Sequence, residues 1–254
     1  MATRARLFVP QEKLGPLVVL DGAEHHYLVH VLRLRPGAQV TLLDGQGSQA
    51  DALVTEVAEH VITLSASPVV RASCDPVQLW LLCGLLKGDK QDFVIQKATE
   101  LGVHHIVPVK CQYSVVQVSD DKADAKRRRW LEIARHAAQQ CRRPDVPTVS
   151  VPLSLADALS QAEGQKLLLF EGSAPPLGQV LDSRTNADSP RAVSMLIGPE
   201  GGLHKDEVAL ATEQGFSVVS LGPRILRAET AVVATLAVVS HHLHLQGASL
   251  DPSK

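Results

Sequence analysis

The feature that most constrains the fold is a regular alternation of apolar runs with helical segments after residue 76. The continuous apolar run at 77–86 is typical of a strand that is buried on both faces. Further strands are predicted at 105–109, 166–170, 192–197 and 217–220. Helices are predicted at 89–101, 122–143, 154–162, 205–213 and 228–244. Such an alternation predicts an α/β unit with a parallel sheet covered by helices on both faces.

The first 70 or so residues have a different pattern of apolar and polar residues. Short alternating runs predict strands at 39–43, 50–57 and 60–65, separated by turn signals at 35–37 and 44–47. One short helix is predicted at 23–34. These elements predict a small β-barrel or β-sandwich. A linker at 68–76 follows, so we expect two domains, residues 1–72 and residues 73–254.

The amino-acid composition and net charge indicate a globular protein with an aliphatic core. The chain has 254 residues, and its hydrophobic content of 45% is enough to build a core. Aromatic residues make up only 3%, so aliphatic side chains must fill that core. The formal net charge of -2 does not mark a nucleic-acid binder, and any basic surface must therefore be local.

The cysteines and the apolar stretches give expectations about the compartment. Four cysteines, Cys74, Cys83, Cys111 and Cys141, are scattered singly, which predicts reduced thiols rather than a disulfide scaffold or a zinc site. The N-terminus lacks the apolar core of a signal peptide. The longest apolar stretch, 231–239, is too short to span a bilayer. We therefore expect a cytoplasmic protein that does not bind a membrane.

Two glycine-containing loops each follow a predicted strand and precede a predicted helix. The first is 198–202, Gly-Pro-Glu-Gly-Gly, and the second is 221–231, which begins Leu-Gly-Pro. Adjacent glycines allow the main chain to approach a ligand closely, although one such loop alone could equally be an ordinary turn. In parallel sheets, ligands bind beyond the carboxyl ends of the strands. We therefore expect a ligand site formed by the segments after Phe170, Ile197 and Leu221.

The second loop carries charges that need an explanation. Glu229 lies near the start of the helix at 228–244, where the helix dipole favours an acid, so it could be a simple cap. Arg224 and Arg227 gain nothing from that dipole. A carboxylate or phosphate partner explains them better.

Common nucleotide and catalytic motifs are absent from the sequence. It contains no G-x-G-x-x-G and no G-x-x-x-x-G-K-[ST], which argues against a nicotinamide-dependent dehydrogenase and a P-loop NTPase. It also contains no H-E-x-x-H zinc motif and no G-x-S-x-G nucleophile elbow. His26 and His30 are four residues apart on a predicted helix, but no cysteine or carboxylate cluster accompanies them, so no metal site is predicted.

Six segments together carry a family resemblance. They are IGPEGG at 197–202, LGPRILRAETA at 221–231, HVLRLRPG at 30–37, KGDKQDFVIQKATELGV at 87–103, RW at 129–130 and QQCRRPDVP at 139–147. With these segments the chain resembles the SPOUT methyltransferase superfamily and, within it, the bacterial 16S ribosomal RNA (uracil-N3)-methyltransferases. The resemblance covers nearly the whole chain.

The resemblance implies a fold and an activity. The fold is an N-terminal PUA-like β-barrel that binds RNA and a C-terminal α/β domain with a trefoil knot. The activity is S-adenosylmethionine-dependent methylation of N3 of a uridine in the 16S rRNA of the small ribosomal subunit. A homodimer is also implied. The helix around 231–239 is apolar almost all round, so it should be buried in the core or in that interface.

The resemblance also implies that the three loops after the strands hold the cofactor. The expected cofactor contacts are Leu169, Phe170, Glu171, Gly172, Ile197, Gly198, Pro199, Glu200, Gly201, Gly202, Leu221, Gly222, Ile225, Leu226, Thr230 and Ala231.

The implied chemistry assigns roles to charged residues. Uracil N3 carries a proton, and its loss places negative charge on the flanking carbonyl oxygens, which a positioned arginine would stabilise. Arg227 is the first choice for that arginine and Arg224 the second, while Glu229 or a water would take the proton.

Basic residues on both domains are the candidates for holding the RNA backbone. They are Arg4, Arg6, Arg33, Arg35, Lys87, Lys90, Arg127, Arg128, Arg135 and Arg143. A run such as 126–129 is often only a solvated helix face. Two basic clusters in separate domains favour the RNA-binding interpretation, with a steep salt dependence.

At three positions the chain departs from the family pattern. Gln139 stands where glutamate is common, Asp145 where arginine is common, and His204 where the helix commonly begins with serine. The first two departures concern RNA contact or dimer contact more than the cofactor site.

Two other functions remain as alternatives. One is a SPOUT ribose 2′-O-methyltransferase, and the other is a non-catalytic RNA-binding factor for ribosome assembly. The PUA-like first domain and the segment at 87–103 favour the N3-methyltransferase over the former. Both cofactor loops are intact, which argues against the latter.

Overall fold

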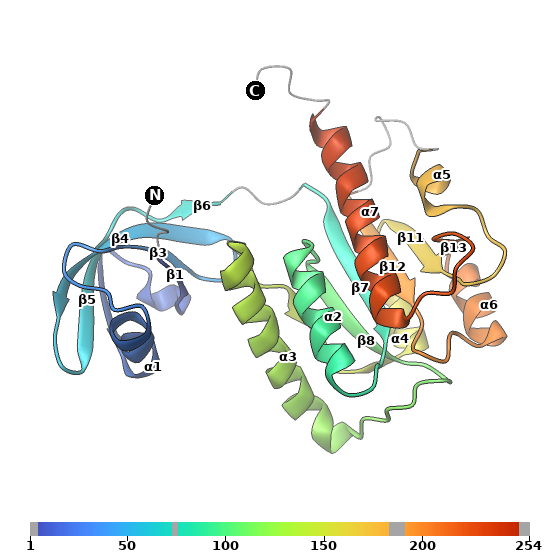
Figure 1. Cartoon of the computed structure of the whole chain (residues 1–254), viewed down its shortest axis with the longest axis horizontal. Coiled ribbons are helices and arrows are strands. Elements are labelled where there is room, and N and C mark those ends of the chain that lie inside the picture. The colour runs from blue at the N-terminus through green and yellow to red at the C-terminus, as the bar shows by residue number, and fades with distance from the viewer. Residues whose placement is uncertain (1–4, 73–75, 183–190, 249–254) are drawn as a thin grey trace. The chain divides into compact units, whose positions relative to one another are not determined.

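The computed structural model describes residues 5–72, 76–182 and 191–248 (Figure 1). The chain divides into two compact units. The first comprises Met1–Cys74 with Ala138–Val146, and the second comprises Asp75–Ala137 with Pro147–Lys254. Within the described residues, no helix is both long and apolar enough to cross a membrane. Cys83, Cys111 and Cys141 are free thiols, while Cys74 lies outside the described residues.

The first unit is built on a six-stranded sheet. Its strands are β1 (Ala5–Phe8), β2 (Leu17–Asp21), β3 (Gln39–Leu43), β4 (Ser48–Val57), β5 (Val61–Ala66) and β6 (Val70–Arg71). The order is β1-β3-β4-β5-β2, with β6 paired to β4, and only the β1–β3 pair is parallel. Leu20, Leu42 and Ile62 are fully buried in its core. The three strands expected here are present, and β1, β2 and β6 are additional short strands.

The helical part of the first unit is less regular than predicted. The single helix expected at 23–34 is a short α-helix, α1 (Gly22–His26), followed directly by one π-helical turn, η2 (Tyr27–Val31). A 3₁₀ turn, η1 (Gln11–Lys13), lies between β1 and β2. Leu28 points into the core and is fully buried, which explains the apolar periodicity.

The segment Ala138–Val146 belongs to the first unit although it lies far along the chain. The Val146 amide donates a hydrogen bond of 2.9 Å to the Gly45 carbonyl, and the Gln139 side-chain amide donates one of 2.5 Å to the Arg6 carbonyl. Gly45 has a φ of 76°, and a Cβ there would lie 3.3 Å from Val146 Cγ2. A small apolar cluster comprises Phe8, Leu43, Ala138 and Val146.

The second unit contains the predicted parallel sheet. Its strands are β7 (Gln78–Gly84), β8 (His105–Lys110), β9 (Thr148–Val149), β10 (Leu153–Ser154), β11 (Gln165–Leu169), β12 (Ala192–Ile197) and β13 (Ser217–Val219). The order is β10-β8-β7-β12-β11-β13, with β9 also on β8, and every pair is parallel. All six residues of β12 are buried, as expected of a strand covered on both faces.

Helices cover both faces of this sheet. They are α2 (Asp89–Glu100), α3 (Asp120–Cys141), α4 (Leu155–Ser160), α5 (Leu177–Asp182), α6 (Lys205–Glu213) and α7 (Ala228–Ala248). Helices α2 and α7 pack side by side on one face (Figure 1). On the other face, Leu82, Leu168 and Leu196 pack against residues of α4 and α6 in one core cluster. Five of these helices are the predicted ones, and the short α5 is additional.

Helix α7 is apolar but is not wholly covered within the single chain. Val232, Leu236 and Val239 are fully buried, whereas Val238 is 40% exposed. Part of α7 is therefore uncovered in the single chain, and burial of that part in a dimer interface stays a prediction.

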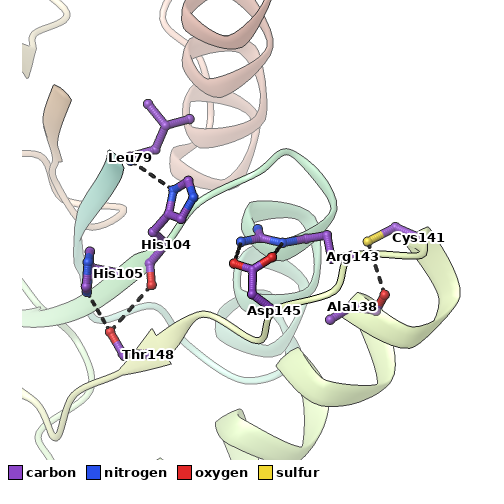
Figure 2. A network of polar contacts seen from close by, with 8 residues as sticks. All are labelled: Leu79, His104, His105, Ala138, Cys141, Arg143, Asp145 and Thr148. Atoms are coloured by element: carbon purple, nitrogen blue, oxygen red, sulfur yellow. Dashed lines mark hydrogen bonds and ion pairs between the residues drawn. The ribbon is translucent and has the colours of Figure 1, made fainter. Parts of the chain in front are cut away.

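Two adjacent histidines tie together the strand ends opposite the glycine loops (Figure 2). The Leu79 amide donates to His104 Nδ1 at 3.1 Å, and the Thr148 hydroxyl lies 2.8 Å from His105 Nδ1. The ring of His105 stacks on Trp80, with ring centroids 3.9 Å apart. Burial lowers the pKa of His105, and the charge of Glu163 offsets this only in part.

This lowered pKa predicts a pH dependence of stability. Between the lowered folded value and the ordinary histidine value, the unfolded chain binds a proton that the folded chain does not. We therefore expect the free energy of unfolding to fall as pH falls through the ordinary histidine pKa. The expected loss is small, because the ring is only half-buried and solvent screens it.

Urea unfolding at pH 7.5 and 5.5 measures this effect. His105→Gln should flatten the difference between the two pH values, and His60→Gln, at an exposed histidine of the first unit, should not. An unchanged difference in His105→Gln would assign the effect to other groups.

Candidate functional site

A cavity of about 590 Å³ lies at the carboxyl ends of β11, β12 and β13, within the second unit. The residues that follow these three strands form its walls, as the strand-end rule predicts. Its lining comprises Lys90, Leu169, Phe170, Glu171, Ile197, Gly198, Pro199, Glu200, Gly202, Leu203, Ser220, Leu221, Gly222, Arg224, Ile225, Leu226, Arg227, Ala228 and Ala231.

The predicted cofactor contacts converge on this cavity, with three exceptions. Gly172 packs behind Phe170, since a Cβ there would lie 2.4 Å from Phe170 Cε1. Gly201 packs against Tyr113, and Thr230 is exposed on α7. Sequence reasoning missed Leu203, Ser220 and Ala228 as lining residues and had assigned Lys90 to RNA. Leu203 and Ser220 each lie one residue outside a predicted loop, whereas Ala228 lies inside the loop 221–231 but was not among its predicted contacts.

Close contacts to the main chain shape the first loop. A Cβ at Gly84, the last residue of β7, would lie 2.4 Å from Pro199 N. At Gly201, a Cβ would lie 2.8 Å from Tyr113 Cβ. The amide of Gly202, with a φ of 75°, donates to the Pro199 carbonyl at 2.9 Å. The loop is therefore a tight turn pressed between β7 and the segment after β8.

His204 and Glu207 fix the exit of this loop into α6. His204 is the N-cap residue, and its Nδ1 accepts from the Asp206 amide at 3.3 Å. The Glu207 carboxylate accepts from two main-chain amides at 2.8 Å, those of His204 and Gln112. The histidine that departs from the family's serine thus still caps the helix.

Lys90 links two carboxylates at the cavity. Its Nζ lies 3.2 Å from Glu200 Oε1 and 3.7 Å from Glu229 Oε2. The Lys87 amide also donates to Glu200 Oε1, at 3.1 Å. Burial alone would raise the pKa of Glu200, but these bonds and one from its own amide outweigh burial, so the pKa lies below its ordinary value. Glu200 is therefore ionised at neutral pH and holds Lys90 in place.

The two arginines of the second loop both line the cavity and are exposed. Ile225, which lies between them, is 78% exposed and adds apolar surface. Glu229 is not part of the lining. Its Oε2 is buried without a hydrogen-bond partner in the described structure. The loop thus presents positive charge to the cavity with a carboxylate close behind.

The basic RNA candidates differ in how free their side chains are. In the first unit, Arg33 and Arg35 are exposed, Arg6 is half-buried, and Arg4 lies outside the described residues. Arg143 is paired with Asp145 (Figure 2), its Nη2 lying 2.6 Å from Asp145 Oδ2. The aspartate that departs from the family pattern therefore engages a neighbouring arginine.

The candidates of the second unit also differ. Lys87 and Arg128 are exposed. Arg127 donates through Nε to the Val149 carbonyl at 2.9 Å, and Arg135 also has an interaction partner. Lys90 lies in the cavity wall, as described above.

Histidines of the first unit lie close together without forming a metal cluster. The rings of His26 and His30 are 5.0 Å apart, and His25 Nε2 lies 3.0 Å from the Ala58 carbonyl oxygen. Across the ranges 5–72, 76–182 and 191–248, no group of three or more histidine, cysteine or carboxylate side chains could hold a metal ion.

Two protein-family models match the chain, one in each of its two parts. The sequence model of an RNA methyltransferase domain matches residues 73–240, and that of an RNA methyltransferase PUA domain matches residues 20–64. A ribosomal RNA small subunit methyltransferase E from Bacillus subtilis is 34% identical over 236 residues, which cover 91% of this chain and 92% of that protein.

Two solved structures resemble the chain over most of its length. One is a ribosomal RNA small subunit methyltransferase E from Neisseria gonorrhoeae bound to S-adenosylmethionine, with a TM-score of 0.82 and 31% identity, covering 94% of this chain and 98% of that one. The other is a putative methyltransferase from Legionella pneumophila with the same cofactor, with a TM-score of 0.82, 29% identity and the same coverage. These matches confirm the predicted fold class, an N-terminal PUA-type β unit followed by a parallel-sheet α/β unit.

Proposed function

The chain belongs to the ribosomal RNA small subunit methyltransferase E family, and from this membership we propose that it methylates N3 of a uridine in 16S rRNA, using S-adenosylmethionine. One observation supports the assignment of this activity to particular residues. The loops after three neighbouring strands form a single cavity that combines apolar walls with two exposed arginines. This combination suits a cofactor with an adenine ring beside a base that must lose a proton.

The cavity lining fits the cofactor. Leu169, Ile197 and Leu226 supply apolar surface for adenine. Glu171 Oε1 approaches Gly202 closely, 3.4 Å from where a Cβ would lie, which brings a carboxylate across the cavity for the ribose hydroxyls. When bound, S-adenosylmethionine supplies an electrophilic methyl group on a positively charged sulfur. We assign the sixteen residues predicted above to this cofactor site, with Gly172, Gly201 and Thr230 as supports rather than walls.

Residues of the second loop act on the uracil. In the reaction, the bond from N3 to the methyl carbon forms as the carbon–sulfur bond breaks, and the bonding pair stays on sulfur. The N3 proton leaves to the Glu229 carboxylate or to water. Arg227, with Arg224 as the second candidate, stabilises the negative charge that spreads to O2 and O4. Lys90 keeps the carboxylates in position and adds positive charge at the rim.

The basic residues of both units are assigned to the RNA backbone. We propose residues 1–72 as an RNA-binding domain and 73–254 as the catalytic domain. Arg33, Arg35, Lys87 and Arg128 are the most accessible contacts. Four further arginines contribute to RNA binding where their existing interactions permit: Arg6, Arg127, Arg135 and Arg143. Arg4 completes the proposed set. A substrate that is part of the ribosome implies that the enzyme acts in the cytoplasm.

The exposed part of α7 supports a homodimer as part of the proposal. Val238 on α7 is 40% exposed, and Phe93 on α2 is 42% exposed. Because α2 and α7 pack together, both residues belong to one helical layer. A second copy covering this layer would bury them.

Methyl transfer from tritiated S-adenosylmethionine tests the proposal. The purified chain is incubated with small ribosomal subunits, with naked 16S rRNA and with 23S rRNA, all from cells that lack the modification. We expect incorporation approaching one methyl group per 16S rRNA in at least one of the first two substrates and none in 23S rRNA. No incorporation, with RNA binding intact, would favour the assembly-factor alternative.

Lys90 should matter for turnover more than Lys97, the other lysine of α2. Lys90→Gln leaves Glu200 and Glu229 without their shared counter-charge, and it places net negative charge beside a developing anion. We expect turnover to fall about 10-fold, with most activity restored in Lys90→Arg. Lys97→Gln removes a lysine that pairs with Glu100 on the same helix and is the matched control. Equal effects of the two glutamine variants would contradict this role.

A further inference from the structure

Two arginines of the first unit adopt a backbone conformation that normally favours glycine. In the described ranges, Arg33 (φ 55°) and Arg142 (φ 67°) are the only non-glycine residues with positive φ. A side chain in this region is strained, because its Cβ crowds the following carbonyl. Strained residues of this kind cluster at ligand-binding and active sites.

Each arginine stands directly after the last turn of a helix. The amide of Arg143 donates to the Ala138 carbonyl at 2.9 Å, and the amide of Leu34 donates to the Leu28 carbonyl at 3.0 Å. These bonds close the helix ends around the left-handed residue, a position at which glycine is usual. The same chain uses glycine at this position after two other helices, namely Gly102 after α2 and Gly215 after α6.

No protein partner explains the side chain of Arg142. It is exposed, and in the described part of the chain its guanidinium forms no ion pair or hydrogen bond with another residue. The next residue differs sharply, since the Arg143 side chain is only 11% exposed and is paired with Asp145. A positive charge near a helix C-terminus is favoured by the dipole, but a residue within the last turn would supply it without strain.

Arg6 lies beside the same helix end. The Gln139 side chain donates to the Arg6 carbonyl, which anchors β1 one turn before Arg142. Arg6 Nε is buried and has no hydrogen-bond partner in the described structure. Burial lowers the pKa of Arg6, the nearby charge of Arg142 lowers it further, and Asp51 offsets these effects in part. The positive charges of Arg6 and Arg142 therefore oppose each other at this end of α3.

We infer that Arg142 and Arg6 form a phosphate-binding site of the first unit for the backbone of the RNA substrate. Guanidinium groups bind phosphate oxygens in bidentate fashion, and an anion between two of them relieves their repulsion. Arg33 is also exposed and also adopts a positive φ directly after a helix. The inference rests on the proposed function, and it adds Arg142 to the RNA contacts proposed above.

Arg142→Gly separates a binding role from a structural one, because glycine adopts this backbone conformation without strain. We expect its thermal unfolding midpoint to equal or exceed that of the wild type. In filter binding of 16S rRNA transcript at 50–200 mM KCl, the slope of log K against log salt should become shallower by about 0.7–0.9. The affinity advantage of the wild type should therefore shrink about threefold across that range.

Two control variants accompany this measurement. Arg71→Gln removes an exposed arginine of the same unit, on β6, and should leave the slope unchanged. Arg142→Lys retains the charge and should retain most of the slope. An unchanged slope in Arg142→Gly, or a lowered unfolding midpoint, overturns the inference.

Methyl transfer by the wild type is measured in parallel and separates the two claims. Transfer to 16S rRNA with no change of slope in Arg142→Gly leaves the proposed function intact and removes only the phosphate site. Absence of transfer by the wild type removes the proposed function, and the inference with it.

Discussion

Arg227→Ala is expected to lower turnover about 100-fold while the Kd for S-adenosylmethionine changes less than about threefold. Arg227 lines the cavity, is exposed and lies on the loop that leads into α7. Its charge is needed only when the uracil becomes an anion, so its loss raises the barrier without removing cofactor contacts. An arginine that contributes to the transition state in this way affects kcat rather than ground-state binding.

Steady-state kinetics with small ribosomal subunits, together with calorimetric titration of the cofactor, measure these two quantities. Arg224→Ala is the matched variant, because Arg224 lies on the same loop and lines the same cavity. A smaller loss in Arg224→Ala supports the assignment. Turnover of Arg227→Ala within about threefold of wild type, or a larger loss in Arg224→Ala, would transfer the role to another residue.

Gly84→Ala is expected to weaken cofactor binding by about 10-fold or more, although residue 84 lies outside the cavity wall. The added Cβ would lie 2.4 Å from Pro199 N, 2.5 Å from Pro199 Cδ and 3.0 Å from the Gly198 carbonyl carbon. These are loop atoms directly behind the cavity, and they cannot move without displacing its wall. Overpacking of this kind also destabilises a fold, typically by about 1–3 kcal/mol.

Gly178→Ala is the matched control for this substitution. Gly178 lies in α5, and a Cβ there would meet no atom within 4 Å, so the cofactor Kd should stay at its wild-type value. Calorimetric titration gives the Kd of each variant, and urea unfolding gives the change in stability. Cofactor binding at wild-type strength in folded Gly84→Ala would contradict the close packing of β7 against the loop.

The architecture of the second unit was largely predictable from the sequence. Strands such as β12, which is apolar apart from Ser194, are buried on both faces, and the helices predicted between them are present. The strand-end rule then located the cavity without knowledge of the ligand. The identity of the ligand came from the family resemblance, because glycine loops of this kind do not by themselves indicate which ligand they bind.

What the sequence could not predict depends on contacts between distant segments. The pairing of Val146 with Gly45 joins Ala138–Val146 to the first unit, and neither periodicity nor a turn motif signals it. In the sequence Gly84 is only one residue of an apolar run. Its close contact with Pro199 is known only from the structure. The π-helical turn at Tyr27–Val31 likewise has no signal in the sequence, where the burial of Leu28 predicted an ordinary helix.

The chemical identity of the methylated nucleoside tests the central claim most directly. Small subunits and naked 16S rRNA from cells that lack the modification are treated with the enzyme and S-adenosylmethionine, digested to nucleosides and analysed by mass spectrometry against synthetic standards. The predicted product is 3-methyluridine, approaching one per 16S rRNA, and it should be nearly absent with Arg227→Ala. Formation of a 2′-O-methylated nucleoside, with no 3-methyluridine, would contradict methylation at N3.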